Sequence, residues 1–330
     1  MRAAFFTGMR TFAVRDVDPP ELQPGEARVR VGYNGICGSD VSLWKVGVMA
    51  GEDRVPGHEW SGVVEEDPTG TWPAGRRVVA IPGRGCGECM WCLEGHPRYC
   101  LNPQNHWGAY AETTNPLAHL LIPVPDEVDD RAAALAEPLG VAMRAVGAAG
   151  VQEGDFVYVS GLGSIGLLAV AALADLGARI VGSDVREDRR AAGEEFGCEM
   201  TFDPMAEDPF WKTLAVDLHG PRYAFECSGA ASAVQYAFNA CGHMGTVVLL
   251  GIPFEPAMFI PAVMSVKEQR ALAMSGPSKQ SMHDALALLA RRPETAKVIT
   301  DERPLSEIQQ AFEDQAEGRG GIKVLIDPRA

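Results

Sequence analysis

The sequence lacks any run of about 18 apolar residues, the length that a helix needs to cross a bilayer. Its first residues, MRAAFFTGMRTFAVRD, also lack the long apolar segment of an export signal. Basic residues are scarce, because 29 Lys and Arg stand against 44 Asp and Glu, for a formal net charge of −15. A nucleic-acid partner needs a basic face that neutralises phosphates. These absences argue against membrane, export and nucleic-acid functions and predict a cytoplasmic protein that binds a small neutral or cationic ligand.

The rest of the composition is typical of a globular protein, with 46% hydrophobic and 22% charged residues. A chain of 330 residues exceeds what one core usually supports, so two domains are expected. The region up to about residue 143 is rich in Gly, Pro and short β-like runs, whereas apolar strands and helical stretches alternate from about 150 to 275. The alternation predicts an α/β fold in which a doubly wound parallel sheet accompanies a β-rich domain.

The C-terminal region contains two helical patterns, near 281–291 and 306–317, before a final strand at IKVLIDP. Ser306 and Gln309 have the spacing of a capping box. The sequence therefore predicts that Ser306 is the N-cap of the second helix.

The middle region contains a glycine motif between a predicted strand, 156–160, and a predicted helix. The motif consists of Gly161, Leu162, Gly163, Ser164, Ile165 and Gly166. Its glycines allow a tight turn, close approach of a pyrophosphate, and close packing of the helix on the strand. The phosphates would lie at the helix N-terminus. The motif predicts dinucleotide binding, and the alternative is a glycine-rich turn without a ligand.

The next predicted strand ends at Asp184, 18 positions beyond Gly166. A carboxylate there can accept hydrogen bonds from both hydroxyls of an adenosine ribose and would repel the 2′-phosphate of NADP. The sequence therefore favours NAD over NADP. Arg186 and Arg189 leave NADP open because either could pair with that phosphate, and Asp184 could instead cap the following helix.

Four of the eight cysteines form a tight cluster in GCGECMWCLEGHPRYC. These are Cys86, Cys89, Cys92 and Cys100. Four thiolates at this spacing can surround Zn²⁺ and leave no position for a substrate, so the cluster predicts a structural zinc site that stabilises its own loop. Disulfides are disfavoured in a reducing compartment. An iron–sulfur cluster uses similar ligands, but nothing else in the sequence indicates electron transfer.

A second group of metal-ligand residue types is spread along the chain: Cys37, His58, Glu59 and Glu137. Together they offer one sulfur, one nitrogen and two carboxylates, enough for a metal site with a position left for water or substrate. The alternative is a buried cysteine, a loop histidine and two surface carboxylates.

The motifs GICGSD, VPGHEWSGVV, the four-cysteine segment, AEPLGVA and VSGLGSIGLLAV occur in this order along the chain. In these motifs the chain resembles the zinc-dependent medium-chain dehydrogenases, most closely their polyol and threonine dehydrogenase branch. The resemblance implies a GroES-like catalytic domain at 1–143, to which 278–330 return, and a Rossmann NAD-binding domain at 144–277. It also implies a homo-oligomer, either a dimer or a tetramer.

Carried over by position, the resemblance implies that Cys37, His58 and Glu59 bind a catalytic zinc, with Glu137 as a further carboxylate at that metal. The four-cysteine segment matches a structural zinc site, so two zinc ions per chain are expected. The catalytic zinc would act as a Lewis acid on a substrate hydroxyl, and hydride would pass to NAD. Ser39 matches the hydroxyl that takes the substrate proton.

The resemblance also implies which residues contact the cofactor. Besides the glycine motif and Asp184, these are Cys227, Gly251 and Ile252. Arg189 is a further candidate for the cofactor site, because it is near Asp184 in sequence and could pair with a phosphate. In many relatives the proton relay ends at a histidine, but this chain has Ser42 at that position. The end of the relay is therefore left open.

GICGSDVSLW and VPGHEWSG are similar to the aminocyclitol dehydrogenases of aminoglycoside biosynthesis, of the 2-deoxy-scyllo-inosamine dehydrogenase kind, in Ser42 and in Trp60 after Glu59. This similarity implies oxidation of a secondary alcohol on an aminocyclitol, amino-sugar or polyol to the ketone. The small-molecule substrate would be polar, and Asp40, Glu59 and Glu137 could attract its ammonium group.

Three other functions account for some of the same sequence features. A sorbitol- or threonine-type dehydrogenase fits the same motifs. A catalytically silent NAD-binding regulator of the same fold would be expected to lack zinc ligands, and none is missing here. A zinc-ribbon nucleic-acid binder would leave the glycine motif unexplained and conflicts with the acidic charge.

Overall fold

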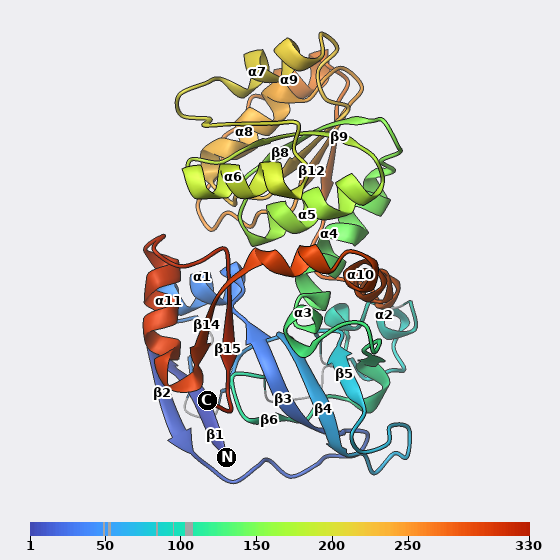
Figure 1. The fold of residues 1–330 in the computed structure, drawn as a ribbon, viewed down its shortest axis with the longest axis vertical. Coiled ribbons are helices and arrows are strands. Elements are labelled where there is room, and N and C mark those ends of the chain that lie inside the picture. The colour runs from blue at the N-terminus through green and yellow to red at the C-terminus, as the bar shows by residue number, and fades with distance from the viewer. Residues whose placement is uncertain (49, 52–53, 84, 95, 103–107) are drawn as a thin grey trace. The chain divides into compact units, whose positions relative to one another are not determined.

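The computed structural model describes residues 1–48, 50–51, 54–83, 85–94, 96–102 and 108–330. The chain forms two compact units, Met1–Gly140 with Gly276–Ala330, and Val141–Ser275. Figure 1 shows the helices and strands of both units. No helix of the described residues is long and apolar enough to cross a membrane.

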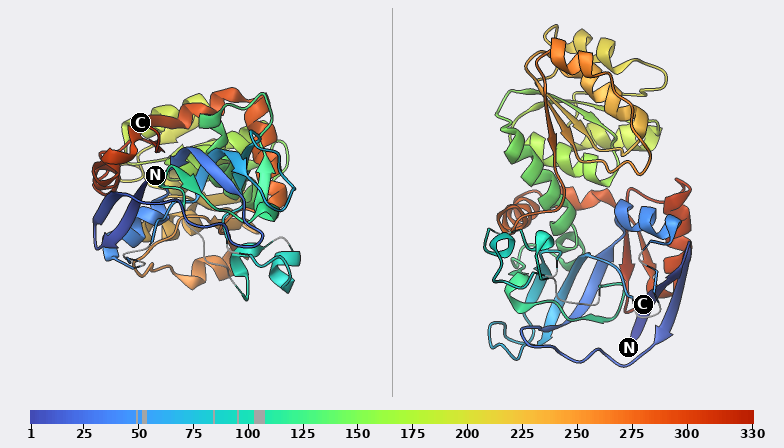
Figure 2. Two further views of the ribbon diagram at one scale, coloured as in Figure 1. Left: turned by 90° about the horizontal axis from the view of Figure 1, so that it is seen from below. Right: turned by 180° about the vertical axis from the view of Figure 1, so that it is seen from behind.

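The first unit contains a mixed sheet whose described strands lie in the order β14-β15-β3-β4-β5-β7, with β6 paired to β3. The strands are β3 (Arg28–Gly35), β4 (Glu59–Glu66), β5 (Arg77–Ala80), β6 (Thr113–Thr114), β7 (Leu121–Pro123), β14 (Ile299–Pro304) and β15 (Lys323–Asp327). A hairpin of β1 (Arg2–Gly8) and β2 (Thr11–Asp16) belongs to the same unit. Arg2 donates hydrogen bonds to the carbonyls of Pro328 and Ala330, so the two termini lie close together (Figure 2).

Short helices surround this sheet. They are α1 (Gly38–Val46), α2 (Met90–Leu93), α3 (Asp130–Ala133), the start of α4 (Ala136–Ala149), α10 (Lys279–Arg291) and α11 (Ile308–Ala316). The 3₁₀ turns are η1 (Pro97–Tyr99), η2 (Ala118–Leu120), η3 (Pro293–Val298) and η4 (Leu305–Glu307). One apolar core lies under α1 and α11, where Trp44 and Phe312 are fully buried, and a second lies along β3, β4 and β5.

The predicted capping box at Ser306 and Gln309 is wrong. Ser306 lies inside the 3₁₀ turn η4, and α11 begins at Ile308 without a side-chain cap. Gln309 is used in a tertiary contact instead, because its Oε1 accepts from the Phe12 N–H at 2.9 Å and its Nε2 donates to the Arg10 carbonyl at 3.1 Å. A capping box does occur in α10, between Ser278 and Ser281.

The second unit is a parallel sheet in the order β10-β9-β8-β11-β12-β13. Its strands are β8 (Phe156–Ser160), β9 (Arg179–Ser183), β10 (Met200–Phe202), β11 (Tyr223–Glu226), β12 (Thr246–Leu249) and β13 (Arg270–Ala273). Its helices are α5 (Ser164–Asp175), α6 (Glu187–Phe196), α7 (Pro209–Val216), α8 (Ala231–Ala240) and α9 (Pro261–Val266). Helices α5 and α6 cover one face and α8 covers the other (Figures 1 and 2).

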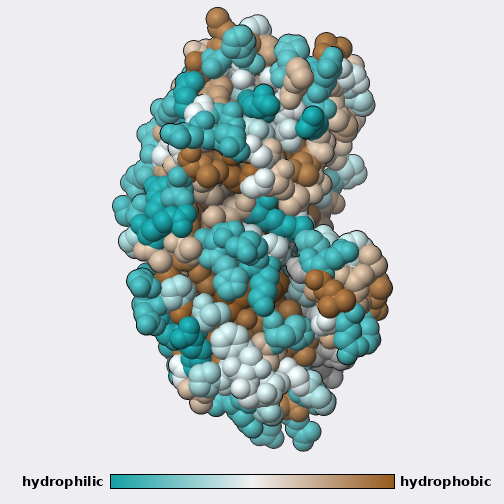
Figure 3. Space-filling view, turned by 90° about the vertical axis from the view of Figure 1, so that its right-hand side faces the viewer, coloured by the Kyte–Doolittle hydropathy of each residue, from teal (hydrophilic) through white to brown (hydrophobic). Residues whose placement is uncertain are grey.

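This arrangement confirms the predicted doubly wound parallel sheet. Strand β8 is buried throughout, which explains why its sequence FVYVS has no polar face. The order of strands places the crossover between β8 and β11, the position where such sheets bind ligands. On the face shown in Figure 3, hydrophobic side chains occur in small groups among hydrophilic ones, as is usual for a protein surface.

Candidate functional site

Cys37, His58 and Glu59 lie together because of the pairing of β3 with β4. Gly35, the last residue of β3, is opposite Glu59, the first residue of β4. The chain leaving β3 and the chain entering β4 are therefore neighbours, and the Cys37 sulfur, a His58 nitrogen and a Glu59 carboxylate oxygen all lie within 4.8 Å of one another. Sulfur, imidazole and carboxylate are the donor set that zinc accepts. This chemistry fits a metal ion.

Asp40, in the first turn of α1, lies behind His58. Its Oδ1 is 3.5 Å from His58 Nδ1, and its Oδ2 accepts a hydrogen bond from the buried Tyr110 hydroxyl at 3.2 Å. Burial acts to lower the pKa of His58, but Asp40 and Cys37 outweigh it and raise that pKa well above its ordinary value. Because Nδ1 of His58 faces Asp40, Nε2 is the nitrogen that could bind a metal ion. Asp40 therefore orients His58.

Sequence reasoning missed Lys323, the first residue of β15. Its ammonium donates to Glu59 Oε2 at 2.6 Å and to the Ile36 carbonyl at 3.0 Å. The Lys323 and Glu59 side chains are only 3% and 2% exposed. Burial acts to lower the pKa of Lys323, but Glu59 and Cys37 raise it above its ordinary value. A lysine in an otherwise apolar strand was the signal that could have found it.

Glu137 lies in the first turn of α4 and is nearly fully buried. It is not among the three residues whose ligand atoms lie within 4.8 Å of one another. Burial raises its pKa to about 7, and the charges of His58 and Glu59 also act on it. Glu137 is therefore close enough for the charges of His58 and Glu59 to affect its pKa, but it lies outside the compact group of Cys37, His58 and Glu59.

Ser39 follows Cys37 in the first turn of α1. Its Oγ lies 3.1 Å from the Cys37 sulfur, and either atom can be the donor. The hydroxyl is therefore next to one of the three atoms that could bind a metal ion.

The four-cysteine segment also folds into one group. The sulfurs of Cys86, Cys89, Cys92 and Cys100 all lie within 4.8 Å of one another. Backbone N–H groups point at these sulfurs, and the Cys86 N–H donates to Cys100 Sγ at 3.2 Å. Hydrogen bonds from the backbone of Leu101 and Cys92 lower the pKa of Cys89 to about 6. Four sulfurs fill a tetrahedron and leave no position for a substrate.

The glycine motif forms the turn from β8 into α5. Gly161 has φ +89°, and a Cβ there would lie 2.7 Å from Ser228. A Cβ on Gly166 would lie 1.8 Å from the Gly161 carbonyl oxygen. Gly163 is the N-cap of α5 and has only the Arg189 guanidinium within 4 Å of an added Cβ. Gly161 and Gly166 therefore have a steric reason to be glycine, whereas Gly163 does not.

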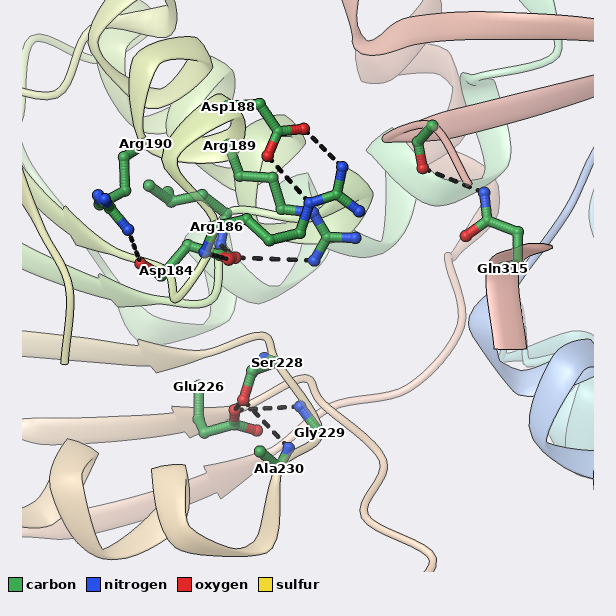
Figure 4. Close-up of polar contacts among 12 residues, drawn as sticks. Asp184, Arg186, Asp188, Arg189, Arg190, Glu226, Ser228, Gly229, Ala230 and Gln315 are labelled. Atoms are coloured by element: carbon green, nitrogen blue, oxygen red, sulfur yellow. Dashed lines mark hydrogen bonds and ion pairs between the residues drawn. The ribbon is translucent and has the colours of Figure 1, made fainter. Parts of the chain in front are cut away.

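Asp184 follows β9 and is buried beside this turn (Figure 4). Its Oδ2 accepts from the Leu162 N–H and its Oδ1 from the Arg186 N–H, each at 2.9 Å. Arg189 Nη1 is 3.7 Å from Asp184 Oδ2. The side chain of Leu162 is buried in the unit and its N–H is used by Asp184. Asp184 thus ties the glycine turn to the neighbouring strand.

Two buried polar atoms near this turn have no hydrogen-bond partner within the described part of the chain. They are Ser164 Oγ, at the start of α5, and Arg189 Nε. Buried polar groups normally have partners. A phosphate at the N-terminus of α5 would supply them, so the residues present fit a dinucleotide.

The remaining predicted cofactor residues follow the neighbouring strands. Glu226 at the end of β11 accepts from the N–H groups of Ser228 and Gly229 (Figure 4), and the Gly251 N–H donates to the Glu226 carbonyl at 2.8 Å. Cys227 lies between Glu226 and Ser228 in sequence, and burial raises the pKa of its thiol. Ile252 is exposed after β12. The glycine turn and Asp184 also follow strands of this parallel sheet, so all these groups meet at its carboxyl edge.

Comparisons with known proteins cover nearly the whole chain. The family model "Alcohol dehydrogenase GroES-like domain" matches residues 23–126, and "Zinc-binding dehydrogenase" matches residues 164–291. The chain is 30% identical to 2-dehydro-3-deoxy-L-galactonate 5-dehydrogenase of Pseudoalteromonas atlantica over 100% of this chain and 99% of the relative. It is 29% identical to sorbitol dehydrogenase of Halalkalibacterium halodurans, with 97% of each covered. The solved structure of alcohol dehydrogenase TADH from Thermus sp. ATN1 matches with a TM-score of 0.91 at 28% identity, over 99% of both chains.

Proposed function

Because this chain belongs to the zinc-dependent medium-chain alcohol and polyol dehydrogenases, we propose that it oxidises a secondary alcohol of a polyhydroxylated small molecule to the ketone, with hydride transfer to NAD. The predicted family and the predicted GroES-like and Rossmann fold class are confirmed by the same matches. The observation that carries the proposal is the group of Cys37, His58 and Glu59, whose ligand atoms lie within 4.8 Å of one another.

In this proposal Cys37, His58 and Glu59 hold the catalytic zinc, with Glu137 as an additional carboxylate. Zinc bound there supplies a Lewis acid that lowers the pKa of a substrate hydroxyl. Cys86, Cys89, Cys92 and Cys100 hold a second, structural zinc, which gives two per chain. Intact ligand sets argue against a catalytically silent regulator.

Ser39 is proposed to accept the substrate proton. The support is its hydroxyl oxygen, which lies 3.1 Å from the sulfur of Cys37, one of the proposed zinc ligands. From Ser39 the proton would pass to water, since residue 42 is a serine rather than a histidine.

Asp184 is proposed to select NAD, and its replacement provides a test. We expect Asp184→Asn to raise the ratio of NADP to NAD activity at least about tenfold, because a like-charge contact with the 2′-phosphate is removed. Asn keeps an acceptor for the Leu162 or Arg186 N–H, whereas Asp184→Ala loses both and should lose stability as well. The measurement is kcat/KM for both cofactors. A wild type that already prefers NADP would show that Arg186 or Arg189 governs this pocket.

For the substrate we propose an aminocyclitol or amino-sugar, with a plain polyol of the sorbitol type as the second candidate. The three carboxylates that could attract the ammonium group of such a substrate differ in their contacts. Asp40 contacts His58, and Glu59 contacts Lys323. Among the residues that the structure describes, Glu137 is the carboxylate of the three without an ion pair to a cationic side chain, although the charges of His58 and Lys323 act on it. The polyol candidate is favoured by the similarity to a sorbitol dehydrogenase.

The substrate proposal predicts that an aminocyclitol is oxidised with a kcat/KM at least about tenfold above that of its deaminated analogue, a ratio that corresponds to one modest charge contact. Sorbitol and threonine belong in the same NAD-reduction assay. Equal rates with and without the amine, or a tenfold advantage for sorbitol or threonine, would reject the aminocyclitol and leave the zinc dehydrogenase in place.

We also propose a homo-oligomer, either a dimer or a tetramer. The support is an exposed edge strand, β13, next to a segment with several exposed large hydrophobic side chains. These are Ile252, Phe254, Met258, Phe259, Ile260 and Val266. An unpaired strand edge with apolar neighbours is suited to pairing with another copy. Sedimentation velocity tests this, and a monomer at micromolar concentration would contradict it.

A further inference from the structure

The ammonium group of Lys323 is buried at the edge of the proposed catalytic metal site. It lies 2.6 Å from Glu59 Oε2 and 3.0 Å from the Ile36 carbonyl, which directly precedes Cys37. A buried ammonium is costly unless it is paired and hydrogen-bonded. The ammonium group of Lys323 has a charged partner, Glu59, and a carbonyl acceptor, Ile36. Both partners belong to the chain segments that carry the proposed metal ligands.

The Glu59 carboxylate also lies against the backbone of Gly35. An added Cβ at Gly35 would lie 2.4 Å from Glu59 Oε2 and 3.4 Å from Lys323 Cδ, so the backbone of Gly35 forms one wall of the space in which they meet. Lys323 and Glu59 come from the strands on either side of β3, because β15 and β4 both pair with β3, and their side chains meet over Gly35. One oxygen of Glu59 is thus bound by the ammonium group of Lys323.

We infer that Lys323 is a positioning residue that shares Glu59 with the metal and limits how strongly this carboxylate binds it. The inference rests on the proposed function, since it concerns the same site. The Cys37 thiolate and the Glu59 carboxylate would give the ligand set two negative charges, and Lys323 cancels one of them. A less negative ligand set binds Zn²⁺ less tightly and leaves it a stronger Lewis acid.

The test uses Lys323→Met, which removes the charge and the hydrogen bonds, and Lys323→Gln, which removes the charge and keeps a donor. Zinc release to a chelator is followed in both variants and in the wild type, and His58→Ala identifies the release phase of the open site. The four-thiolate zinc is the internal control, because its ligands lie on another loop of the same unit. The second variant keeps the test available if the methionine variant does not fold.

We expect the open site to bind zinc at least about tenfold more tightly in both variants, since a nearby positive charge is removed. We expect kcat to fall about tenfold or more while KM for NAD is unchanged, and the thiolate bands of the cobalt-substituted open site to shift. The four-thiolate zinc should be released at the wild-type rate. Unchanged or weaker binding at the open site, or loss of both zinc ions together, would overturn the inference. Absence of zinc from the open site of the wild type would instead contradict the proposed function.

Discussion

His58→Ala is expected to reduce kcat/KM about a thousandfold or more, because a Lewis acid that contributes several kcal/mol of transition-state stabilisation loses a ligand. The imidazole is one of three ligand groups within 4.8 Å of one another, and alanine offers no replacement donor. The thermal midpoint should change little, since His58 is partly exposed and lies outside the apolar cores. Steady-state kinetics with NAD, together with a melting curve, measure both quantities.

Cys89→Ser is the matched control and should show the opposite pattern. The four-cysteine segment buries little apolar surface, because Met90, Leu93 and Leu101 are all exposed. A bound metal would therefore contribute much of the local stability of this segment. We expect one zinc to be lost and limited proteolysis within residues 86–102 to become about tenfold faster or more, with a smaller loss of kcat. If both variants lost activity and stability alike, the division into a catalytic and a structural site would be wrong.

Ser39→Ala is expected to lower kcat about a hundredfold, the size of effect that a positioned proton acceptor usually has. Zinc content should remain at the wild-type level, because the residue is next to a ligand rather than a ligand itself. The measurement is kcat at several pH values, with zinc analysis of the same preparation.

A structural role for Ser39 predicts something different. The hydroxyl lies 3.1 Å from the Cys37 sulfur and could serve only to fix that sulfur. In that case Ser39→Ala would lose zinc while zinc-saturated enzyme kept its kcat. Ser39→Thr retains a hydroxyl and should recover part of the activity, which makes it the control for the proton role.

The parallel unit could be predicted almost completely from the sequence. Its strands are short apolar runs separated by helical patterns, and local patterns of this kind are enough to identify a doubly wound sheet. The glycine motif was likewise predictable from the sequence, because local geometry excludes a side chain at Gly161 and at Gly166. In contrast, the cap predicted at Ser306 failed because Gln309 contacts β2, an interaction that no local pattern encodes.

The metal group was partly predictable. Cys37, His58 and Glu59 are donor types in two separate motifs, and the pairing of Gly35 with Glu59 brings the motifs together. Lys323 was missed because it is 264 residues from Glu59 in sequence and has no motif around it. Its contact depends on β15 joining the sheet beside β3, which is a tertiary event.

Metal depletion and reconstitution test the central claim most directly. Purified protein is freed of the open-site zinc with a chelator, and NADH formation from a secondary alcohol is followed as zinc is returned. The account predicts that activity is lost on depletion and returns in proportion to occupancy of the site formed by Cys37, His58 and Glu59. Full activity in protein whose open site holds no metal, or no activity with any secondary alcohol when both zinc sites are filled, would contradict it.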